Sequence, residues 1–188
     1  MKNIIGVDEV GRGSLAGPVV ACAVSFHKGY NPLHLKDSKK TSAKKRELIF
    51  SEVENSSFVE WGVGVVSEKI VDQINILEAT KLAMKRSLEK IDYRNSHIIV
   101  DGNFSLQGFP DQESLLRADE KVAQCSLASI IAKVTRDRIM QSFHDRFPQY
   151  GFYHHKGYGT NAHREALNLH GPCLIHRKSF RLLTAKNK

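Results

Sequence analysis

An apolar run near the start of the chain ends abruptly in two acidic residues, and this junction constrains the fold more than any other feature. Residues 4–7 read Ile-Ile-Gly-Val, which predicts a buried β-strand. Asp8 and Glu9 follow at once, just before a Gly-Arg-Gly turn at 11–13. Burying a carboxylate costs free energy unless something such as a metal ion compensates its charge. We therefore expect a functional site at the end of this strand.

A second strand ends in the same way. Residues 97–100 read His-Ile-Ile-Val, and Asp101 and Gly102 follow. If the two strands are neighbours in one sheet, about 4.8 Å apart, Asp8 and Asp101 converge on one point. Asp119, at the start of a predicted long helix, is a further candidate for this cluster. The alternative is that Asp8 and Asp101 merely end strands while Asp119 caps a helix, and the convergence of the set favours the site.

Carboxylate-rich sites of this kind suit Mg²⁺ or Mn²⁺. Two such ions, about 4 Å apart, can hold a phosphodiester between an attacking water and a leaving oxygen. The predicted cluster is therefore compatible with hydrolysis of a phosphodiester.

The rest of the pattern predicts one α/β domain over residues 1–188, without repeats or a dividing linker. Strands are expected at 4–8, 18–24 and 58–66, and the short connection between the first two suggests an antiparallel meander. The helix over 75–91 opens with Asn75 as its cap and Glu78 three residues later. Further helices are expected at 44–53, 119–147 and 161–169, the last within a helical C-terminal part that covers about 148–188.

The charge balance points to a polyanionic partner. The chain has 28 Lys+Arg against 20 Asp+Glu, a net charge of +8, and its basic residues cluster at 36–46 and 164–188. Two solvated basic surfaces would be the plainer explanation. The odd, widely spaced Cys22, Cys125 and Cys173 argue against a disulfide framework. No stretch reads as a signal peptide or membrane span, so we expect a cytosolic protein without membrane association.

Six sequence blocks identify a family that the chain resembles along nearly its whole length. They are Gly-Val-Asp-Glu-Val-Gly-Arg-Gly at 6–13, Asp-Ser-Lys-Lys at 37–40, Val-Asp-Gly at 100–102, Ala-Asp at 118–119, His-Lys-Gly-Tyr-Gly-Thr at 155–160 and His-Arg-Lys-Ser-Phe at 176–180. Together they resemble ribonuclease HII, the bacterial type 2 ribonuclease H family. The resemblance implies a ribonuclease H-like fold: a five-stranded mixed sheet flanked by helices, with a helical C-terminal part and a fifth strand near 114–117.

The resemblance also implies an activity. Members of the family cleave RNA in RNA–DNA hybrids and cut on the 5′ side of single ribonucleotides embedded in duplex DNA, which leaves 3′-hydroxyl and 5′-phosphate ends. By resemblance, Asp8, Glu9 and Asp101 hold the divalent ions, Mn²⁺ or Mg²⁺, most directly, and Asp119 completes the second ion site.

Substrate contacts follow from the same resemblance. The backbone of Gly11, Arg12 and Gly13 would contact the ribose 2′-hydroxyl, and Tyr158 would stack against that sugar. Four basic residues would hold backbone phosphates without reading sequence. They are Lys39, Lys40, Arg177 and Lys178.

The sequence departs from the family pattern at Ser14, Thr41 and Arg117, where proline, leucine and lysine are usual. None of these changes removes a catalytic group. Two other hypotheses remain: a catalytically silent hybrid-binding module of the same fold, and the sister enzyme ribonuclease HIII. The latter carries an additional N-terminal domain, whereas here the catalytic strand begins at Ile4. We expect a monomer; residues 182–188 show no clear clamp-binding peptide, so a replication-clamp partner stays unknown.

Overall fold

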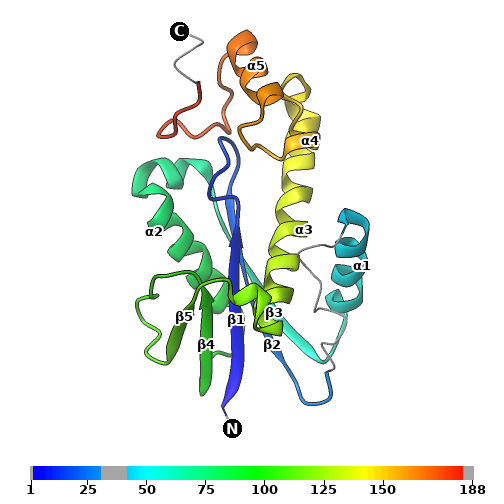
Figure 1. The fold of residues 1–188 in the computed structure, drawn as a ribbon, viewed down its shortest axis with the longest axis vertical. Coiled ribbons are helices and arrows are strands. Elements are labelled where there is room, and N and C mark those ends of the chain that lie inside the picture. Colours follow the sequence, from blue (N-terminus) through cyan, green and yellow to red (C-terminus); the bar gives the residue numbers. More distant parts are fainter. Residues whose placement is uncertain (1, 31–41, 184–188) are drawn as a thin grey trace.

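The computed structural model describes residues 2–30 and 42–183, and a five-stranded sheet forms its centre (Figure 1). The strand order across the sheet is β3-β2-β1-β4-β5. The strands are β1 (Asn3–Val10), β2 (Val19–Phe26), β3 (Val59–Val66), β4 (Ser96–Asp101) and β5 (Gln112–Leu115).

The sheet is mixed, as the resemblance implied. β2 pairs antiparallel with both β1 and β3, which confirms the predicted meander, while β4 pairs parallel with β1 and with β5. The fifth strand, Gln112–Leu115, begins two residues before the range expected for it. The first helix lies in the chain between β2 and β3, so the meander is not continuous in sequence.

Helices cover both faces of the sheet (Figure 1). Alternate residues of β2 divide between two cores: Val19 and Ala21 pack with α2, whereas Val20 and Cys22 pack with α1 and α3. This is why β2 is buried along almost its whole length. The helices are α1 (Ala43–Glu54), α2 (Glu68–Leu88), α3 (Ala123–Arg146), α4 (Phe152–His155) and α5 (Asn161–His170), with short 3₁₀ turns η3 (Ala118–Glu120) and η4 (Pro148–Tyr150).

Helix α2 contains the cap that the sequence predicted. Asn75 has a φ of 66°, outside the helical range, and its side-chain Oδ1 accepts hydrogen bonds from the N–H groups of Leu77 (2.9 Å) and Glu78 (3.1 Å). Asn75 therefore caps the second half of the helix. The turns before it, from Glu68, were not predicted.

The long helix expected over 119–147 begins later than predicted. Asp119 lies on the separate turn η3, Val122 is extended, and α3 begins only at Ala123. The reason lies in β4, because the Asp101 carboxylate accepts the N–H groups of Ala118 (3.2 Å) and Asp119 (3.5 Å) and so anchors η3 to the sheet.

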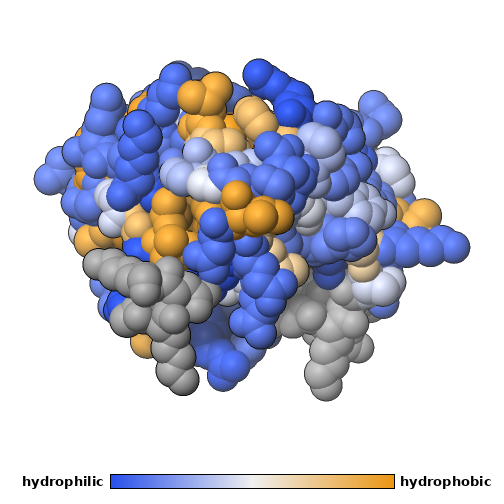
Figure 2. All heavy atoms as spheres, turned by 90° about the horizontal axis from the view of Figure 1, so that it is seen from above, coloured by the Kyte–Doolittle hydropathy of each residue, from blue (hydrophilic) through white to orange (hydrophobic). Residues whose placement is uncertain are grey.

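The C-terminal part packs at one end of the molecule, around a third core that includes Leu15, Met140, Phe152 and Ile175 (Figure 1). Seen from this end, hydrophilic side chains cover most of the surface and hydrophobic ones gather in a smaller patch (Figure 2). Within the described residues, no helix combines the length and hydrophobicity that a membrane span needs.

Candidate active site at the ends of β1 and β4

Three acidic side chains from three different elements meet near the carboxyl ends of the neighbouring strands β1 and β4. Because β1 and β4 are parallel and Val7 pairs with Val100, Asp8 and Asp101 follow on adjacent strands at the same level. Asp119 reaches them from η3. One carboxylate oxygen of each residue lies within 4.8 Å of the corresponding oxygens of the other two. The structure thus brings together three of the four acids predicted for the metal site.

Hydrogen bonds fix the orientation of two members, Asp8 and Asp101, of this acidic trio, which Asp119 completes. The Asp8 Oδ1 accepts the backbone N–H of Glu9 at 2.7 Å, and the Ser129 hydroxyl of α3 donates to the same carboxyl group. The Asp101 oxygens accept the two amides of η3 described above. The side chains of Asp8 and Asp101 are therefore held in place by the polypeptide itself.

The acidic trio is electrostatically strained without a cation. Burial raises the pKa of Asp8 well above its ordinary value, and the neighbouring charge of Glu9 raises it further. Burial also raises the pKa of Asp101, with the charge of Asp119 and a hydrogen bond to the Asp119 side chain acting in the same direction. Crowded carboxylates that disfavour their own ionisation, with oxygen as the only donor atom, fit a hard divalent cation such as Mg²⁺ or Mn²⁺.

Glu9, the fourth predicted acid, lies slightly apart from the acidic trio. Its Oε1 is 3.2 Å from the Nη1 of Arg12, and only 11% of its side chain is exposed. Burial raises the pKa of Glu9, whereas the charge of Arg12 opposes this shift. Glu9 and Asp119 both line a cavity of about 180 Å³, to which Ser129 and Lys133 also contribute. Glu9 is therefore adjacent to the trio while paired with Arg12.

One predicted phosphate contact is wrong. Arg177 has no exposed surface, and its guanidinium donates to the carbonyl oxygens of Gly11 (2.7 Å), Arg12 (2.8 Å) and Gly17 (2.9 and 3.1 Å). These bonds occupy the side chain beneath the glycine turn, so it is not available to a phosphate. Its place in a basic tail suggested exposure, and nothing local in the sequence revealed its burial.

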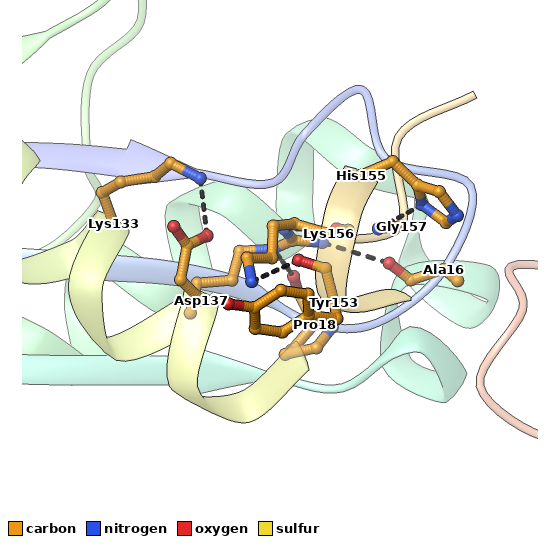
Figure 3. A network of polar contacts seen from close by, with 9 residues as sticks. Ala16, Pro18, Lys133, Asp137, Tyr153, His155, Lys156 and Gly157 are labelled. Atoms are coloured by element: carbon orange, nitrogen blue, oxygen red, sulfur yellow. Dashed lines mark hydrogen bonds and ion pairs between the residues drawn. The ribbon is translucent and has the colours of Figure 1, made fainter. Parts of the chain in front are cut away.

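Arg136 is a second buried arginine, and it was not among the residues predicted for the site. Its guanidinium donates to the carbonyl oxygens of Ala16 (3.1 Å), Pro18 (2.9 Å) and Lys156 (2.8 Å), three groups that lie close together in Figure 3. Arg136 thereby joins α3 to the loop that follows the glycine turn and to the loop that carries Tyr158. The neighbouring Asp137 pairs with Lys133 at 2.5 Å and is not a member of the acidic trio.

Tyr158 lies beside the glycine turn. It forms a β-bridge with Ser14, and the N–H of Leu15 donates to the carbonyl oxygen of Gly157 at 2.8 Å. The Tyr158 ring centre is 5.5 Å from the guanidinium carbon of Arg136. The structure therefore places next to one another the two elements expected to contact a ribose.

The two glycines of the turn occupy different surroundings. Gly11 is buried with a φ of 95°, and a Cβ there would collide with the Arg136 side chain and the carbonyl of Pro18. At Gly13 a Cβ would meet no atom within 4 Å, because this residue faces open space. Protein packing thus explains the glycine at 11 but not the one at 13.

Of the remaining predicted phosphate contacts, only Lys178 lies among the residues that the structure describes. Lys178 is exposed, and its backbone N–H donates to Asp72 at 2.9 Å. Arg117, a departure from the family pattern, pairs with Glu120 at 3.3 Å. Lys39 and Lys40, together with Thr41, lie outside the residues that the structure describes.

Comparison with known proteins identifies a related family. The family model described as ribonuclease HII matches residues 5–183. The chain is 45% identical over 185 residues to ribonuclease HII of Syntrophus aciditrophicus, a match covering 98% of this chain and 87% of that protein. It is 47% identical over 177 residues to ribonuclease HII of Acholeplasma laidlawii, covering 94% of this chain and 86% of the relative.

Solved structures show the same fold. The ribonuclease HII of Archaeoglobus fulgidus, solved in complex with PCNA, matches with a TM-score of 0.79 and 25% identity, covering 98% of this chain and 100% of that one. A Bst ribonuclease HIII solved in complex with Mn²⁺ matches with a TM-score of 0.78 at 19% identity, covering 96% of this chain and 68% of that chain. At that identity the second match bears on the fold alone.

Proposed function

The chain belongs to the ribonuclease HII family of metal-dependent endoribonucleases, and from that premise we propose that it degrades the RNA strand of RNA–DNA hybrids and cuts 5′ of single ribonucleotides in duplex DNA. The observation that carries the proposal is the acidic trio Asp8, Asp101 and Asp119. A carboxylate cluster in a protein of net charge +8 suits the hydrolysis of a phosphodiester in a nucleic acid.

The acidic trio together with Glu9 would hold Mn²⁺ or Mg²⁺, the ions that an oxygen-only donor set favours. When bound, a pair of such ions supplies an activated water and neutralises charge on the leaving 3′-oxygen, which would give 3′-hydroxyl and 5′-phosphate ends. The pairing of Glu9 with Arg12 in this structure is compatible with that role, because the Arg12 side chain is partly exposed.

The glycine turn would recognise the ribonucleotide through its backbone. The carbonyl groups of Gly11 and Arg12 point at the buried guanidinium of Arg177. In a trans peptide the C=O and N–H groups point in opposite directions, so the N–H groups of Arg12 and Gly13 point away from Arg177. These two amides would donate hydrogen bonds to the sugar and its phosphate. The open space at Gly13 leaves room for the nucleotide.

Other groups would position the duplex. Tyr158, held beside the turn, would pack against the ribose. Lys39, Lys40 and Lys178 would contact backbone phosphates, in keeping with the net charge of +8. A cytosolic location and a monomeric state remain predictions from the sequence.

A cleavage assay tests the proposed function. The substrates are a labelled DNA duplex with one ribonucleotide, an RNA–DNA hybrid and an all-DNA duplex, each with Mg²⁺, Mn²⁺ or EDTA. We expect metal-dependent cuts in the hybrid and on the 5′ side of the single ribonucleotide, with the all-DNA duplex intact. Cleavage of the hybrid alone would contradict the role of the turn and Tyr158. Retained binding without any cleavage would favour the catalytically silent module.

A further inference from the structure

Two buried histidines touch each other in the C-terminal part, outside the acidic site. The side chains of His163 (0% exposed) and His176 (1% exposed) meet with their Nε2 atoms 3.0 Å apart. His163 lies on α5, whereas His176 belongs to the segment after it. Neither contacts the acidic trio, and the hydrolysis described above does not use either of them.

The surrounding hydrogen bonds determine the tautomer of each ring. The Nδ1 of His176 accepts the backbone N–H of Cys173 at 2.9 Å, so its proton is on Nε2. The Nδ1 of His163 lies 2.9 Å from the carbonyl oxygen of Tyr158, which only accepts, so that nitrogen carries the proton. His176 Nε2–H therefore donates to His163 Nε2. The result is a one-way chain of hydrogen bonds from the Cys173 amide to the Tyr158 carbonyl.

Both rings are neutral in this arrangement, because protonation would set an N–H against another donor. Burial lowers the pKa of both His163 and His176 to about 4. The same chain of hydrogen bonds is therefore maintained throughout the neutral pH range.

A third histidine holds the neighbouring peptide group. His155 stacks on His163 with ring centroids 4.4 Å apart. Its Nδ1 accepts the N–H of Gly157 at 3.2 Å, and its Nε2 donates to the carbonyl of Tyr150 at 2.7 Å. Figure 3 shows the His155 ring turned toward Gly157. His155 thus holds the amide of Gly157, and His163 holds the carbonyl of Tyr158. Two histidine side chains therefore fix two adjacent residues of this loop.

The position of the histidine pair links these contacts to the candidate site. The segment after the glycine turn forms a β-bridge with Tyr158 at Ser14 and another with His176 at Ala16. His163 connects the two flanking segments, since it contacts His176 through one nitrogen and the Tyr158 carbonyl through the other. The turn, Tyr158 and the C-terminal segment therefore form a closed ring of contacts.

We propose that His163 and His176 form an uncharged tie that fixes the backbone of Tyr158 relative to the glycine turn, which makes both histidines positioning residues for cleavage. The inference rests on the proposed function, in which the turn and Tyr158 contact the ribonucleotide. It assigns a role in the reaction to two side chains that are remote from the metal site.

A metal site at the same place is not supported. The Cys173 Sγ lies 3.2 Å from His176 Nδ1, but that nitrogen already accepts the Cys173 amide. In the parts of the chain that the structure describes, three metal-ligating groups gather only at the acidic trio. The geometry therefore favours a hydrogen-bonded tie.

A double-mutant cycle tests the proposal by single-turnover cleavage of a duplex with one ribonucleotide, well below the unfolding temperature of every variant. His176→Leu removes the donor to His163 at similar volume. Losing a hydrogen bond that aligns a group corresponds to about a tenfold slower rate. In the protein that retains Tyr158, His176→Leu should slow cleavage by this factor. In the Tyr158→Ala background, the same change should slow cleavage by less than about twofold. Mn²⁺ binding, measured by calorimetry, should be the same in all four proteins.

Controls separate positioning from general destabilisation. His176→Gln keeps an N–H near the position of Nε2 and should recover much of the rate. Leu167→Ala removes a buried apolar side chain from α5, the helix that carries His163, and should lower stability without slowing cleavage. An equal rate loss with and without Tyr158, or a loss in Leu167→Ala as large as in His176→Leu, would overturn the tie.

The wild-type protein offers a readout that does not depend on variants folding. ¹⁵N NMR of the imidazoles should show His163 protonated on Nδ1 and His176 on Nε2 at neutral pH. The opposite tautomers, or a charged ring, would overturn the proposal. Wild-type cleavage that depends on Tyr158 but not on His176 would reject the tie alone, whereas no cleavage by the wild type would reject the proposed function.

Discussion

Asp8 within β1 and Asp101 at the end of β4 lie side by side, because the parallel register that pairs Val7 with Val100 places the following residues at the same level. Main-chain pairing therefore sets the separation of the two carboxylates, and burial together with neighbouring charges raises the pKa of each. The sheet stabilises an arrangement that the carboxylates alone would oppose, and a divalent cation would relieve the repulsion.

Asp8→Asn or Asp101→Asn should abolish most cleavage while leaving the fold intact. Each change keeps the side-chain shape but removes one charged ligand, so we expect the rate to fall at least about a hundredfold. The metal-free Asp8→Asn variant should unfold at a temperature equal to or above that of the wild type, because repulsion is reduced. Asp101→Asn also loses one of the two oxygens that accept the amides of η3, so its unfolding temperature should not rise. Cleavage assays and thermal unfolding measure the two effects, and near-normal turnover in either variant would exclude this site.

The stabilising effect of metal should depend on pH. Since the pKa values of Asp8 and Asp101 are raised on folding, the folded state binds protons more tightly than the unfolded state. The contribution of Asp8 and Asp101 to the stability of the metal-free protein should therefore be greatest below the ordinary carboxyl pKa and should fall as pH rises through the raised values. A cation binds the ionised carboxylates and opposes this loss.

Thermal unfolding with and without Mn²⁺, measured across acidic pH, checks this linkage. The increase in unfolding temperature caused by Mn²⁺ should grow as pH rises and should be small where the carboxyl groups are protonated. Asp101→Asn should weaken the dependence. A constant increase at all pH values would mean that the ion binds elsewhere.

Arg177 and Lys178 are adjacent in sequence and should respond in opposite ways. Arg177→Met leaves the carbonyls of Gly11, Arg12 and Gly17 without their buried donor, so we expect a loss of about 2–4 kcal/mol in unfolding free energy. Lys178→Ala should change stability by less than about 0.5 kcal/mol. It should instead lower the slope of log affinity for duplex against log salt by about 1.

Chemical denaturation and binding titrations at several salt concentrations distinguish these outcomes. If Arg177→Met retained full stability and instead reduced the salt slope, the buried role described for Arg177 would be wrong. A salt slope unaffected by Lys178→Ala would remove that lysine from the nucleic-acid surface.

Features that depend on neighbouring residues in the chain could be predicted from the sequence. The strand segments that lead to Asp8 and Asp101 are marked by apolar runs followed by acid and glycine, although β1 continues to Val10. The Asn75 cap is marked by its own side chain and Glu78. Convergence of the strand ends required only that the two strands be neighbours. The fold class then followed from the family resemblance.

Features set by distant backbone could not be predicted in this way. Arg177 donates to carbonyl groups about 160 residues earlier in the chain, and Arg136 does so across about 120 residues. The separate turn at Asp119 depends on hydrogen bonds to Asp101 on another strand. An arginine in a basic segment looks the same in sequence whether phosphates or buried carbonyls accept its hydrogen bonds.

Gly11→Ala and Gly13→Ala should separate the two requirements of the turn. At Gly11 the positive φ and the collision of a Cβ with Arg136 should together cost about 2–4 kcal/mol of stability. Gly13→Ala should change stability by less than about 0.5 kcal/mol, since its Cβ meets no protein atom. If the open space there receives the ribonucleotide, this second variant should still slow cleavage at least about tenfold.

The comparison is informative because the same methyl group is added two residues apart. Denaturation curves give the stability of each variant, and single-turnover cleavage of the duplex with one ribonucleotide gives its rate. A Gly13→Ala protein that is both stable and fully active would show that substrate does not approach this face of the turn. A Gly13→Ala protein that is stable but cleaves slowly would show that the ribose contacts the turn at Gly13, where packing within the protein does not require a glycine.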